Sequence, residues 1–245
     1  MSGEIIVAVD PRDPQAARDA IVVGGLLAGL DEAPLRAVTV VAPHEDERSQ
    51  ERALTASMAT AGVAGEAIVL AARSPARALH EIGDRERPLA IVIGSGRRSI
   101  AEPSRLGAVA EPLLHGGAVP VVVVPRGHAA RSTGLGAIGV AFDGTPEARD
   151  AWRHGEGIAG AAQTTLRVLT IAEDEDDPAE ALAEATRELD LLVAGSRSYG
   201  PLRAVLLGRT TRRLLPIAHC PVMIVPRVPV SAEAVTLIGG MEAVS

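Results

Sequence analysis

A stretch of 36 residues that occurs twice constrains this sequence more than any other feature. The copies run from Ala90 to Pro125 and from Leu191 to Pro226. Each copy contains two glycines thirteen residues apart, Gly94 and Gly107 in the first copy and Gly195 and Gly208 in the second. In both copies a proline follows thirteen residues after the second glycine. A spacing kept to the residue over this length indicates that one structural unit has been duplicated.

The order of apolar and polar residues predicts the elements inside the unit. Each copy begins with an apolar run that ends in Gly-Ser, which is typical of a buried strand entering a tight turn. A polar loop with spaced glycines follows, and a helix is expected to begin near Gly107 or Gly208. Each copy closes with a proline-flanked apolar run, Val121–Val124 or Val222–Val225, which suits a short strand buried on both faces.

Strands and helices alternate through the rest of the chain, and this predicts an α/β fold with parallel sheets covered by helices. Further strands are expected at residues 5–9, 35–41, 66–71, 137–142 and 166–171. Further helices are expected at residues 14–30, 44–61, 74–82 and 178–188, and after Thr145-Pro146. Ser-Pro and Thr-Pro pairs support these starts because they place an N-cap ahead of a proline at the first helical position.

The duplication divides the chain into two tandem open-sheet domains. We expect a five-stranded domain at residues 1–126 and a four-stranded domain at residues 137–228. Residues 127–136, rich in Arg, Ser, Thr and Gly, are interpreted as the linker between them. Residues 229–245 are interpreted as a C-terminal tail.

The second domain is a trimmed version of the first. The sequence places 84 residues between Asp10 and Gly94 but only 52 between Asp143 and Gly195, so about one helix and one strand are missing. The acidic run Glu173–Asp177 stands in their place. Five adjacent carboxylates cannot all converge on one metal ion, so we interpret this run as a solvated loop. Its negative charge would discourage pairing at an exposed sheet edge.

Composition excludes several classes of function. All 24 basic residues are arginine, which excludes Schiff-base chemistry and a P-loop, because both need a lysine. A net charge of −7 and only three aromatic residues argue against nucleic-acid binding, which uses a basic face and stacking platforms. The single cysteine, Cys220, excludes an intrachain disulfide, and we expect it to be a small buried filler. The sequence shows no N-terminal signal segment, and we expect a soluble, cytoplasmic protein that does not insert into membranes.

No catalytic motif emerges from the sequence. Ser95 and Ser196 lack the full nucleophile elbow, so we interpret them as turn-capping residues. The six histidines are scattered without metal-ligand spacing, and no residue is recognisable as a general base poised for attack. We therefore expect no catalytic residue and no metal site, and favour a binding protein over an enzyme.

Three motifs in order resemble those of the universal stress protein family. They are the strand end Asp143-Gly-Thr-Pro146, the glycine-spaced loop of the duplicated unit, and the closing segment Ala218-His-Cys-Pro-Val222. Each half resembles one domain of that family, and the chain as a whole resembles its tandem two-domain form. The resemblance implies Rossmann-like, adenine-nucleotide alpha-hydrolase-like sheets with strand order 3-2-1-4-5. It also implies ATP binding at the carboxyl ends of strands one and four, where the strand order reverses.

The resemblance carries this nucleotide site over to both halves, and more completely to the second. In the second half it implies ATP contacts from Asp143, Gly144, Thr145, Gly195, Ser198, Gly208, Arg209 and Thr210. In the first half it implies a weaker site made of Asp10, Gly94, Arg97, Gly107 and Ala108. The departures are Ser198 and Arg97 in place of a glycine, and Arg209 and Ala108 in place of a hydroxyl residue. Backbone N–H groups of the loop would face the phosphates, with Mg²⁺ only as a companion of ATP.

We therefore expect a cytosolic stress-response binding or scaffold protein with weak ATP binding in its second half. Two alternatives stay open: a weak ATPase or nucleotide hydrolase, and a regulatory accessory subunit of a transporter, where this fold also occurs. The resemblance further implies that the last strands of the two halves, Val121–Val124 and Val222–Val225, pair within the chain. Dimerisation of the whole chain and an unidentified protein partner are compatible with this arrangement.

Overall fold

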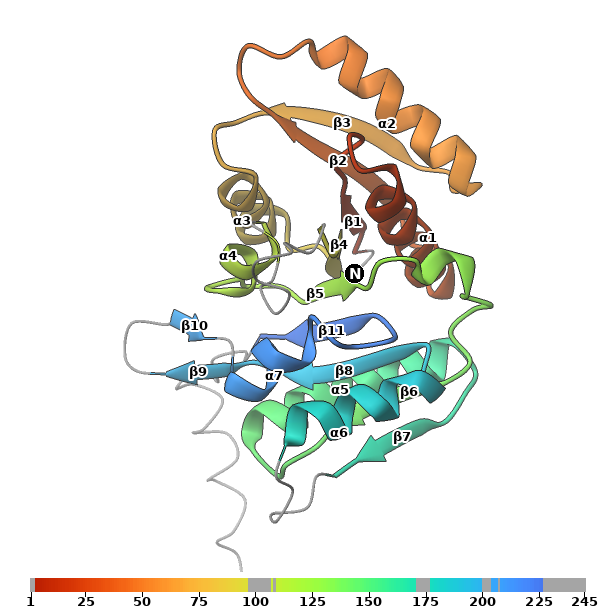
Figure 1. Ribbon diagram of the computed structural model, residues 1–245, viewed down its shortest axis with the longest axis vertical. Helices are drawn as coiled ribbons and strands as arrows, with labels where there is room; N and C mark the ends of the chain where they lie inside the picture. The colour runs from red at the N-terminus through yellow and green to blue at the C-terminus, as the bar shows by residue number, and fades with distance from the viewer. Residues whose placement is uncertain are drawn as a thin grey trace, which may run out of the picture.

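The structure is a computed structural model that describes residues 3–96, 107, 109–170, 177–199, 204–206 and 208–226. Nine strands form one sheet of order β3-β2-β1-β4-β5-β11-β8-β6-β7, with helices on both faces (Figure 1). The first five strands have the predicted order 3-2-1-4-5, and the last four have the same order without the third strand. The predicted α/β fold, with a second sheet trimmed by one helix and one strand, is confirmed.

The bounds of the elements follow the predicted ones to within a few residues. The strands of the sheet are β1 (Ile5–Ala8), β2 (Leu35–Val41), β3 (Glu66–Ala71), β4 (Ala90–Gly94), β5 (Val121–Val124), β6 (Ile138–Ala141), β7 (Leu166–Leu169), β8 (Leu191–Gly195) and β11 (Val222–Val225). The α-helices are α1 (Pro14–Leu30), α2 (Glu47–Ala61), α3 (Pro75–Glu86), α4 (Ala110–Leu114), α5 (Pro146–Ala161), α6 (Pro178–Ala185) and α7 (Arg209–Leu214). Short 3₁₀ turns occupy His128–Ala130 and Thr186–Glu188.

The helix starts are set by capping side chains. A side chain at the N-cap accepts a hydrogen bond from a backbone N–H of the first turn in five helices: Asp13 in α1, Asp46 in α2, Ser74 in α3, Thr145 in α5 and Asp177 in α6. Such caps satisfy N–H groups that have no partner within the helix. The helix expected from residue 44 therefore begins at Glu47, directly after its cap.

Two buried clusters, one on each face of the sheet, form the core. Val92 belongs to the cluster beneath α1, α2 and α5, whereas Ile91 and Ile93 belong to the cluster beneath α3, α4, α6 and α7. Strands whose alternate residues are buried on opposite faces need apolar side chains at nearly every position. This burial explains the continuous apolar runs of the duplicated unit.

The two halves of the chain are joined through β5 and β11. These strands pair antiparallel, with Val122 opposite Met223 and Val123 opposite Val222. The other seven pairings of the nine-stranded sheet are parallel. The strands for which the resemblance implied an intrachain pairing therefore lie side by side at the centre of the sheet (Figure 1).

The glycine-spaced loop of the second half differs from the prediction. We expected an irregular polar loop between Gly195 and Gly208, but β9 (Arg197–Tyr199) and β10 (Ala204–Leu206) pair there as an antiparallel hairpin. Ser198 lies opposite Val205 in this hairpin. The backbone N–H groups that hydrogen-bond between β9 and β10 are not free to bind phosphates. The second loop is therefore not simply a phosphate-binding loop.

The segment between the halves is anchored by one carboxylate from each of them. Asp19 of α1, which is 2% exposed, accepts hydrogen bonds from the N–H groups of Gly127 (2.7 Å) and Ala129 (2.8 Å). Asp190, just before β8, accepts from the N–H groups of Gly136 and Ala137, both at 2.9 Å. The expected linker is therefore held at both of its ends.

None of the helices in the described part of the chain combines the length and the apolar character needed to cross a bilayer. The acidic residues 173–176, the tail 229–245, and Arg97 and Ala108 lie outside the described residues.

The continuous sheet predicts that the two halves unfold together. Trp152, the only tryptophan, lies in the second half and packs edge to face on Phe142, with ring centroids 5.1 Å apart. A cavity made in the first half by Leu79→Ala, at a side chain that is 1% exposed, should cost about 2–5 kcal/mol. We expect the urea midpoint of Trp152 fluorescence to fall together with that of far-UV circular dichroism.

Leu89→Ala is the control, because Leu89 is also in the first half but 43% exposed. It should move neither midpoint by much. A Trp152 transition that keeps its wild-type midpoint in Leu79→Ala would show instead that the halves unfold separately.

Candidate functional site

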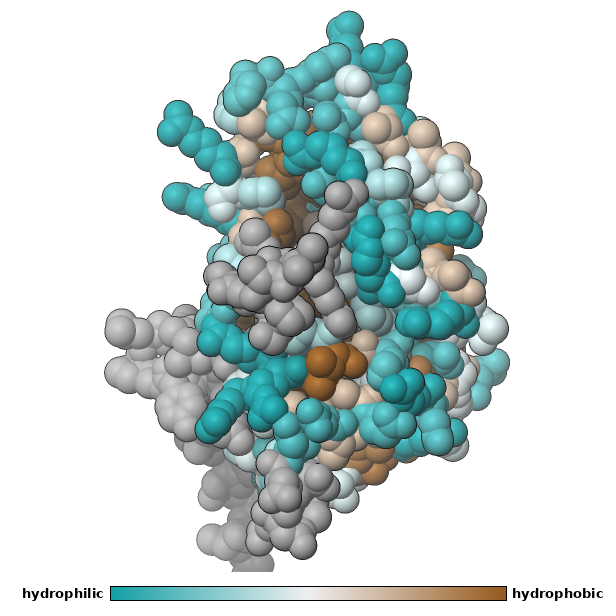
Figure 2. Space-filling view, viewed as in Figure 1, coloured by the Kyte–Doolittle hydropathy of each residue, from teal (hydrophilic) through white to brown (hydrophobic). Residues whose placement is uncertain are grey.

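A crevice opens at the carboxyl ends of β1 and β4, where the strand order of the first half reverses. Open α/β sheets present their ligand crevices at such a point. The cavity has a volume of about 290 Å³, and Asp10 and Gly94 mark the two strand ends that border it. Val38 and Val40 of β2 and Leu79 of α3 give it an apolar wall. Figure 2 shows the hollow between α1 and α3, with apolar atoms on its floor.

Asp10 lies at the mouth of the crevice and is engaged by Arg12. The backbone N–H of Arg12 donates to Oδ1 of Asp10 at 3.0 Å, and its Nε donates to the same oxygen at 2.9 Å. The hydrogen bond to Asp10 raises the pKa of Arg12, and the charge of Asp10 acts in the same direction. Both side chains are more than half exposed, so a ligand can compete for either group.

The first glycine of each loop is required by packing. A Cβ atom on Gly94 would lie 2.5 Å from the carbonyl oxygen of Ala16, and one on Gly195 would lie 2.4 Å from that of Glu147. In both halves the first turn of a helix therefore rests on bare backbone at the end of a strand. These two glycines are explained by the fold alone, whether or not a ligand binds.

Gly96 and Gly107 meet at the edge of the crevice. A Cβ atom on Gly107 would lie 3.5 Å from the backbone nitrogen of Gly96, and one on Gly96 would lie 3.9 Å from the Cα of Gly107. The structure thus brings Gly107 to the site, as predicted, and adds Gly96. The sequence offered a signal for Gly96, since it follows Gly94 by two residues in the loop, but it stands one position before the family's second glycine.

An ion pair ties the first turn of α1 to the end of β5. Nη1 and Nη2 of Arg126 donate to the two carboxylate oxygens of Asp13 at 2.8 and 2.9 Å. Asp13 also caps α1 by accepting from the N–H of Ala16. It takes the place that Thr145 holds in the second half, displaced by one residue because Pro11 is inserted after Asp10. Both members of this pair were missed in the sequence, since 113 positions separate them.

The second half repeats the strand-end motif with a tighter local geometry. Oδ1 of Asp143 accepts from the N–H of Thr145 at 3.1 Å and from its hydroxyl, and Thr145 caps α5 through the N–H of Ala148. Gly144 between them has a φ of +78°, which favours glycine. The predicted residues Asp143, Gly144 and Thr145 therefore form one compact turn at the end of β6.

The remaining predicted residues of the second half lie around the start of α7. Gly208 is the N-cap of that helix, while Arg209 and Thr210 form its first turn, Arg209 being exposed. Ser196, which follows Gly195, is fully buried, and its hydroxyl has no hydrogen-bond partner in the part of the chain that the structure describes. Ser196 is therefore a core residue and not an exposed nucleophile.

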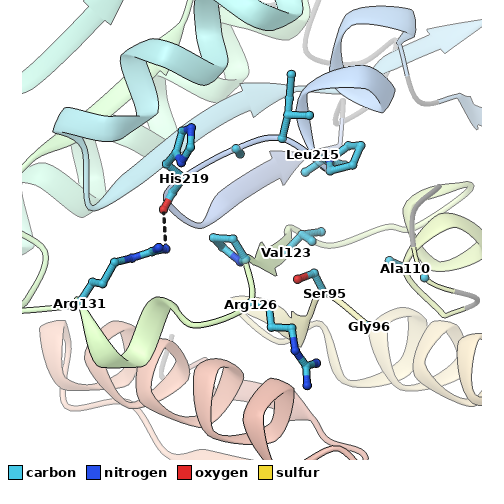
Figure 3. Close-up of a pocket in the computed structure, with 13 residues that line it drawn as sticks. Ser95, Gly96, Ala110, Val123, Arg126, Arg131, Leu215 and His219 are labelled. Atoms are coloured by element: carbon cyan, nitrogen blue, oxygen red, sulfur yellow. Dashed lines mark hydrogen bonds between the residues drawn. The ribbon is translucent and has the colours of Figure 1, made fainter. Parts of the chain in front are cut away.

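A larger cavity of about 740 Å³ lies between the halves. Ser95 and Gly96 line it from the first half, Arg131 from the linker, and Leu215 and His219 from the second half. In Figure 3 the residues of the second half face those of the first across this space. Nη2 of Arg131 donates to the backbone oxygen of His219 at 3.3 Å. Nothing in the sequence indicates this cavity, because its walls come from segments that lie far apart along the chain.

The last candidates for a reactive or metal-binding group are Cys220 and the acidic residues in the described part of the chain. The thiol of Cys220 is 1% exposed, and burial raises its pKa to about 12. A thiol of this pKa stays protonated near neutral pH, which agrees with the predicted role as a buried filler. Within the described residues, no group of three or more His, Cys, Asp or Glu side chains could hold a metal ion.

Substitution of the two packing glycines tests their structural role. Gly94→Ala and Gly195→Ala should each lower the free energy of unfolding by about 1–3 kcal/mol, because the added methyl meets backbone that cannot move away. Gly157→Ala in α5 is the matched control, since a Cβ there meets nothing within 4 Å. We expect it to be neutral or stabilising by up to about 1 kcal/mol in urea denaturation. Equal losses in all three variants would contradict the packing explanation.

A buried histidine in the linker should make stability depend on pH. His128 is 5% exposed, and burial lowers its pKa below 6.5, with the charge of Arg131 acting in the same direction and those of Asp19 and Asp190 opposing it. As the pH falls, the unfolded state therefore binds the proton first. The stability that comes from burying the neutral ring is complete above about pH 6.5 and is lost below it.

We expect the unfolding free energy of the wild type to fall between about pH 6.5 and 5 more steeply than that of His128→Gln. His44→Gln, at an exposed position, is the control and should keep the wild-type slope. A wild-type slope retained by His128→Gln would show that another group is responsible.

Comparison with known proteins identifies a family model and solved structures that this chain resembles. The model of the universal stress protein family matches residues 173–226. A universal stress protein from Archaeoglobus fulgidus DSM 4304 is 17% identical, with a TM-score of 0.68 over 93% of this chain and 100% of that one. A functionally unknown protein from Pseudomonas aeruginosa PAO1 is 14% identical, with a TM-score of 0.69 over 97% of this chain and 98% of the other. No curated protein sequence matches the chain.

These matches confirm the resemblance to universal stress proteins that the sequence motifs indicated. The family model matches the second copy of the duplicated unit together with the helix before it. The solved structures share the fold over nearly the whole chain, including both halves.

Proposed function

We propose that this chain is a stress-response protein of the universal stress protein type that binds an adenine nucleotide, such as ATP, in the crevice of its first half. The observation that carries the proposal is the cavity of about 290 Å³ at the reversal of strand order, bordered by Asp10, Gly94 and Gly107. This volume lies near the lower end of the range of about 300–1,000 Å³ for small-molecule pockets, and it suits a nucleoside.

The lining of the crevice supports a separate role for each part of a nucleotide. Val38, Val40 and Leu79 offer apolar surface for a base, and Asp10 offers a carboxylate to accept from ribose hydroxyls. Phosphates would lie toward Gly96 and Gly107, which themselves carry no side chain between a phosphate and the backbone. Arg12, which lines the crevice, supplies an exposed guanidinium once it exchanges Asp10 for a phosphate. The residues present therefore fit the ligand that the family resemblance implies.

The sequence motif favours a nucleotide site in the second half, whereas the geometry of the described residues favours one in the first half. Asp143-Gly-Thr-Pro146 matches the family motif better than Asp10 and its neighbours, so the sequence alone favours the second half. In the structure, however, the hairpin β9–β10 occupies the loop after Gly195. We therefore assign the nucleotide to the first half and treat the second as a structural copy.

Calorimetric titration with ATP·Mg and with AMP tests the proposal. We expect one site per wild-type chain, with binding lost in Gly107→Trp, whose indole would fill the crevice. Gly208→Trp is the matched control, because it places the same side chain at the equivalent position of the other half, and it should keep the site. Circular dichroism of both variants verifies the fold.

Two outcomes would overturn this assignment. Binding lost in Gly208→Trp and kept in Gly107→Trp would move the site to the second half. No binding by the wild type at millimolar nucleotide would leave a scaffold function in its place. Phosphate release measured in the same samples separates binding from hydrolysis, and we expect no turnover above a protein-free blank.

A further inference from the structure

We propose that the cavity between the halves binds the far end of an extended ligand whose first nucleoside lies in the crevice, and that this ligand is a dinucleoside polyphosphate. The inference rests on the proposed function and extends its site into the second half. It comes from three observations: a shared wall between the two cavities, their sizes, and the chemistry of the larger one.

The crevice and the larger cavity are neighbours with a common border. Gly96, Gly107 and Ala110 line both of them, so the described part of the border carries no side chain larger than a methyl group. Gly96 and Gly107 approach each other there through bare backbone. A polyphosphate chain leaving the crevice can therefore cross this border in contact with backbone N–H groups.

The sizes of the two spaces fit a ligand with two ends. The crevice, at about 290 Å³, accommodates little more than a nucleoside. The neighbouring cavity, at about 740 Å³, is large enough for a second nucleoside together with phosphates. A mononucleotide would leave most of this space to water.

Arg131 gives the larger cavity an available cation. Its side chain is exposed, and no carboxylate among the described residues pairs with it. In the cavity its Nη2 donates a long hydrogen bond of 3.3 Å to the backbone oxygen of His219. Arg126 differs, because both of its terminal nitrogens are held by Asp13. Guanidinium groups bind phosphate oxygens in a bidentate way, so Arg131 is the residue that we expect to hold the distal phosphates.

The second half contributes apolar surface for a second base. Leu215, Pro216 and Ile217 line the cavity after α7, and Ile217 is 37% exposed, which is unusual for a large aliphatic side chain in this chain. Figure 2 shows apolar surface on the same face at the level of α7 and β11. A purine ring packed there would remove this surface from water. The larger cavity thus offers both a guanidinium group and an apolar surface to the far end of the ligand.

The test compares AMP, ATP and diadenosine tetraphosphate by calorimetric titration of the full chain. We expect the wild type to bind the dinucleotide at least tenfold more tightly than ATP. Ile217→Trp should fill the larger cavity and remove this advantage while changing the AMP affinity less than twofold. Val168→Trp is its control, since Val168 is also an exposed aliphatic residue of the second half, at 42%, and lies far along the sheet on β7.

A second pair of variants tests the cation. Arg131→Gln should weaken the binding of the dinucleotide at least fivefold and the binding of AMP less than twofold. Arg187→Gln, which removes a surface guanidinium paired with Glu184, should change neither. These differences would not arise from a general loss of stability, because AMP reports on the same folded crevice.

The outcomes separate this inference from the function on which it rests. If AMP and ATP bind but the dinucleotide binds no more tightly than ATP, the proposal of an extended ligand is wrong and that of a nucleotide site in the crevice is retained. The same conclusion follows if Ile217→Trp still binds the dinucleotide more tightly than ATP. If the wild type binds none of the three, the nucleotide site and the extended ligand are both wrong.

Discussion

The antiparallel contact between β5 and β11 is the constraint on which the rest of the structure depends. Each of these strands consists of four apolar residues buried on both faces, and such a strand left at a sheet edge would invite aggregation. Pairing them satisfies both edges at once and merges two sheets into one. Because the pairing is antiparallel, the carboxyl ends of the first half's strands lie beside the amino end of β11. The larger cavity beside the crevice is therefore lined by the segment that leads into β11, including Ile217 and His219.

The linker is shaped by the same geometry. It must leave the carboxyl end of β5 and reach β6 on the other side of β11 and β8, and carboxylates withdrawn from water along this path need hydrogen-bond partners. Asp19 and Asp190 obtain theirs from linker N–H groups, so each half fixes one end of the segment. Asp13 does more, because it caps α1 beside the crevice and also holds Arg126 directly after β5. The position of the linker is thereby coupled to the site.

Patterns in the sequence were sufficient for the elements and for the strand and helix that the second half lacks, whereas the strand order and the pairing of β5 with β11 were implied by the family resemblance. Apolar runs, capping residues and the repeat spacing can be read directly from a single sequence. The hairpin β9–β10 was missed because each of its strands has only three residues. The roles of Arg126 and Arg131 were missed because their partners, Asp13 and His219, lie 113 and 88 positions away. The contact of Arg131 joins the linker to the second half, whereas Arg126 and Asp13 both belong to the first half.

The duplicated glycines show why the spacing survived while the loop residues drifted. A Cβ atom added to Gly94 or Gly195 would lie within 2.5 Å of a helix carbonyl oxygen. A side chain at either position would therefore disturb the packing of its own half in the same way. The two loops have changed in different directions: one forms a hairpin, whereas the other brings Gly96 against Gly107 beside an open crevice. Duplication followed by pairing thus leaves one half free to serve as a wall of the other half's site.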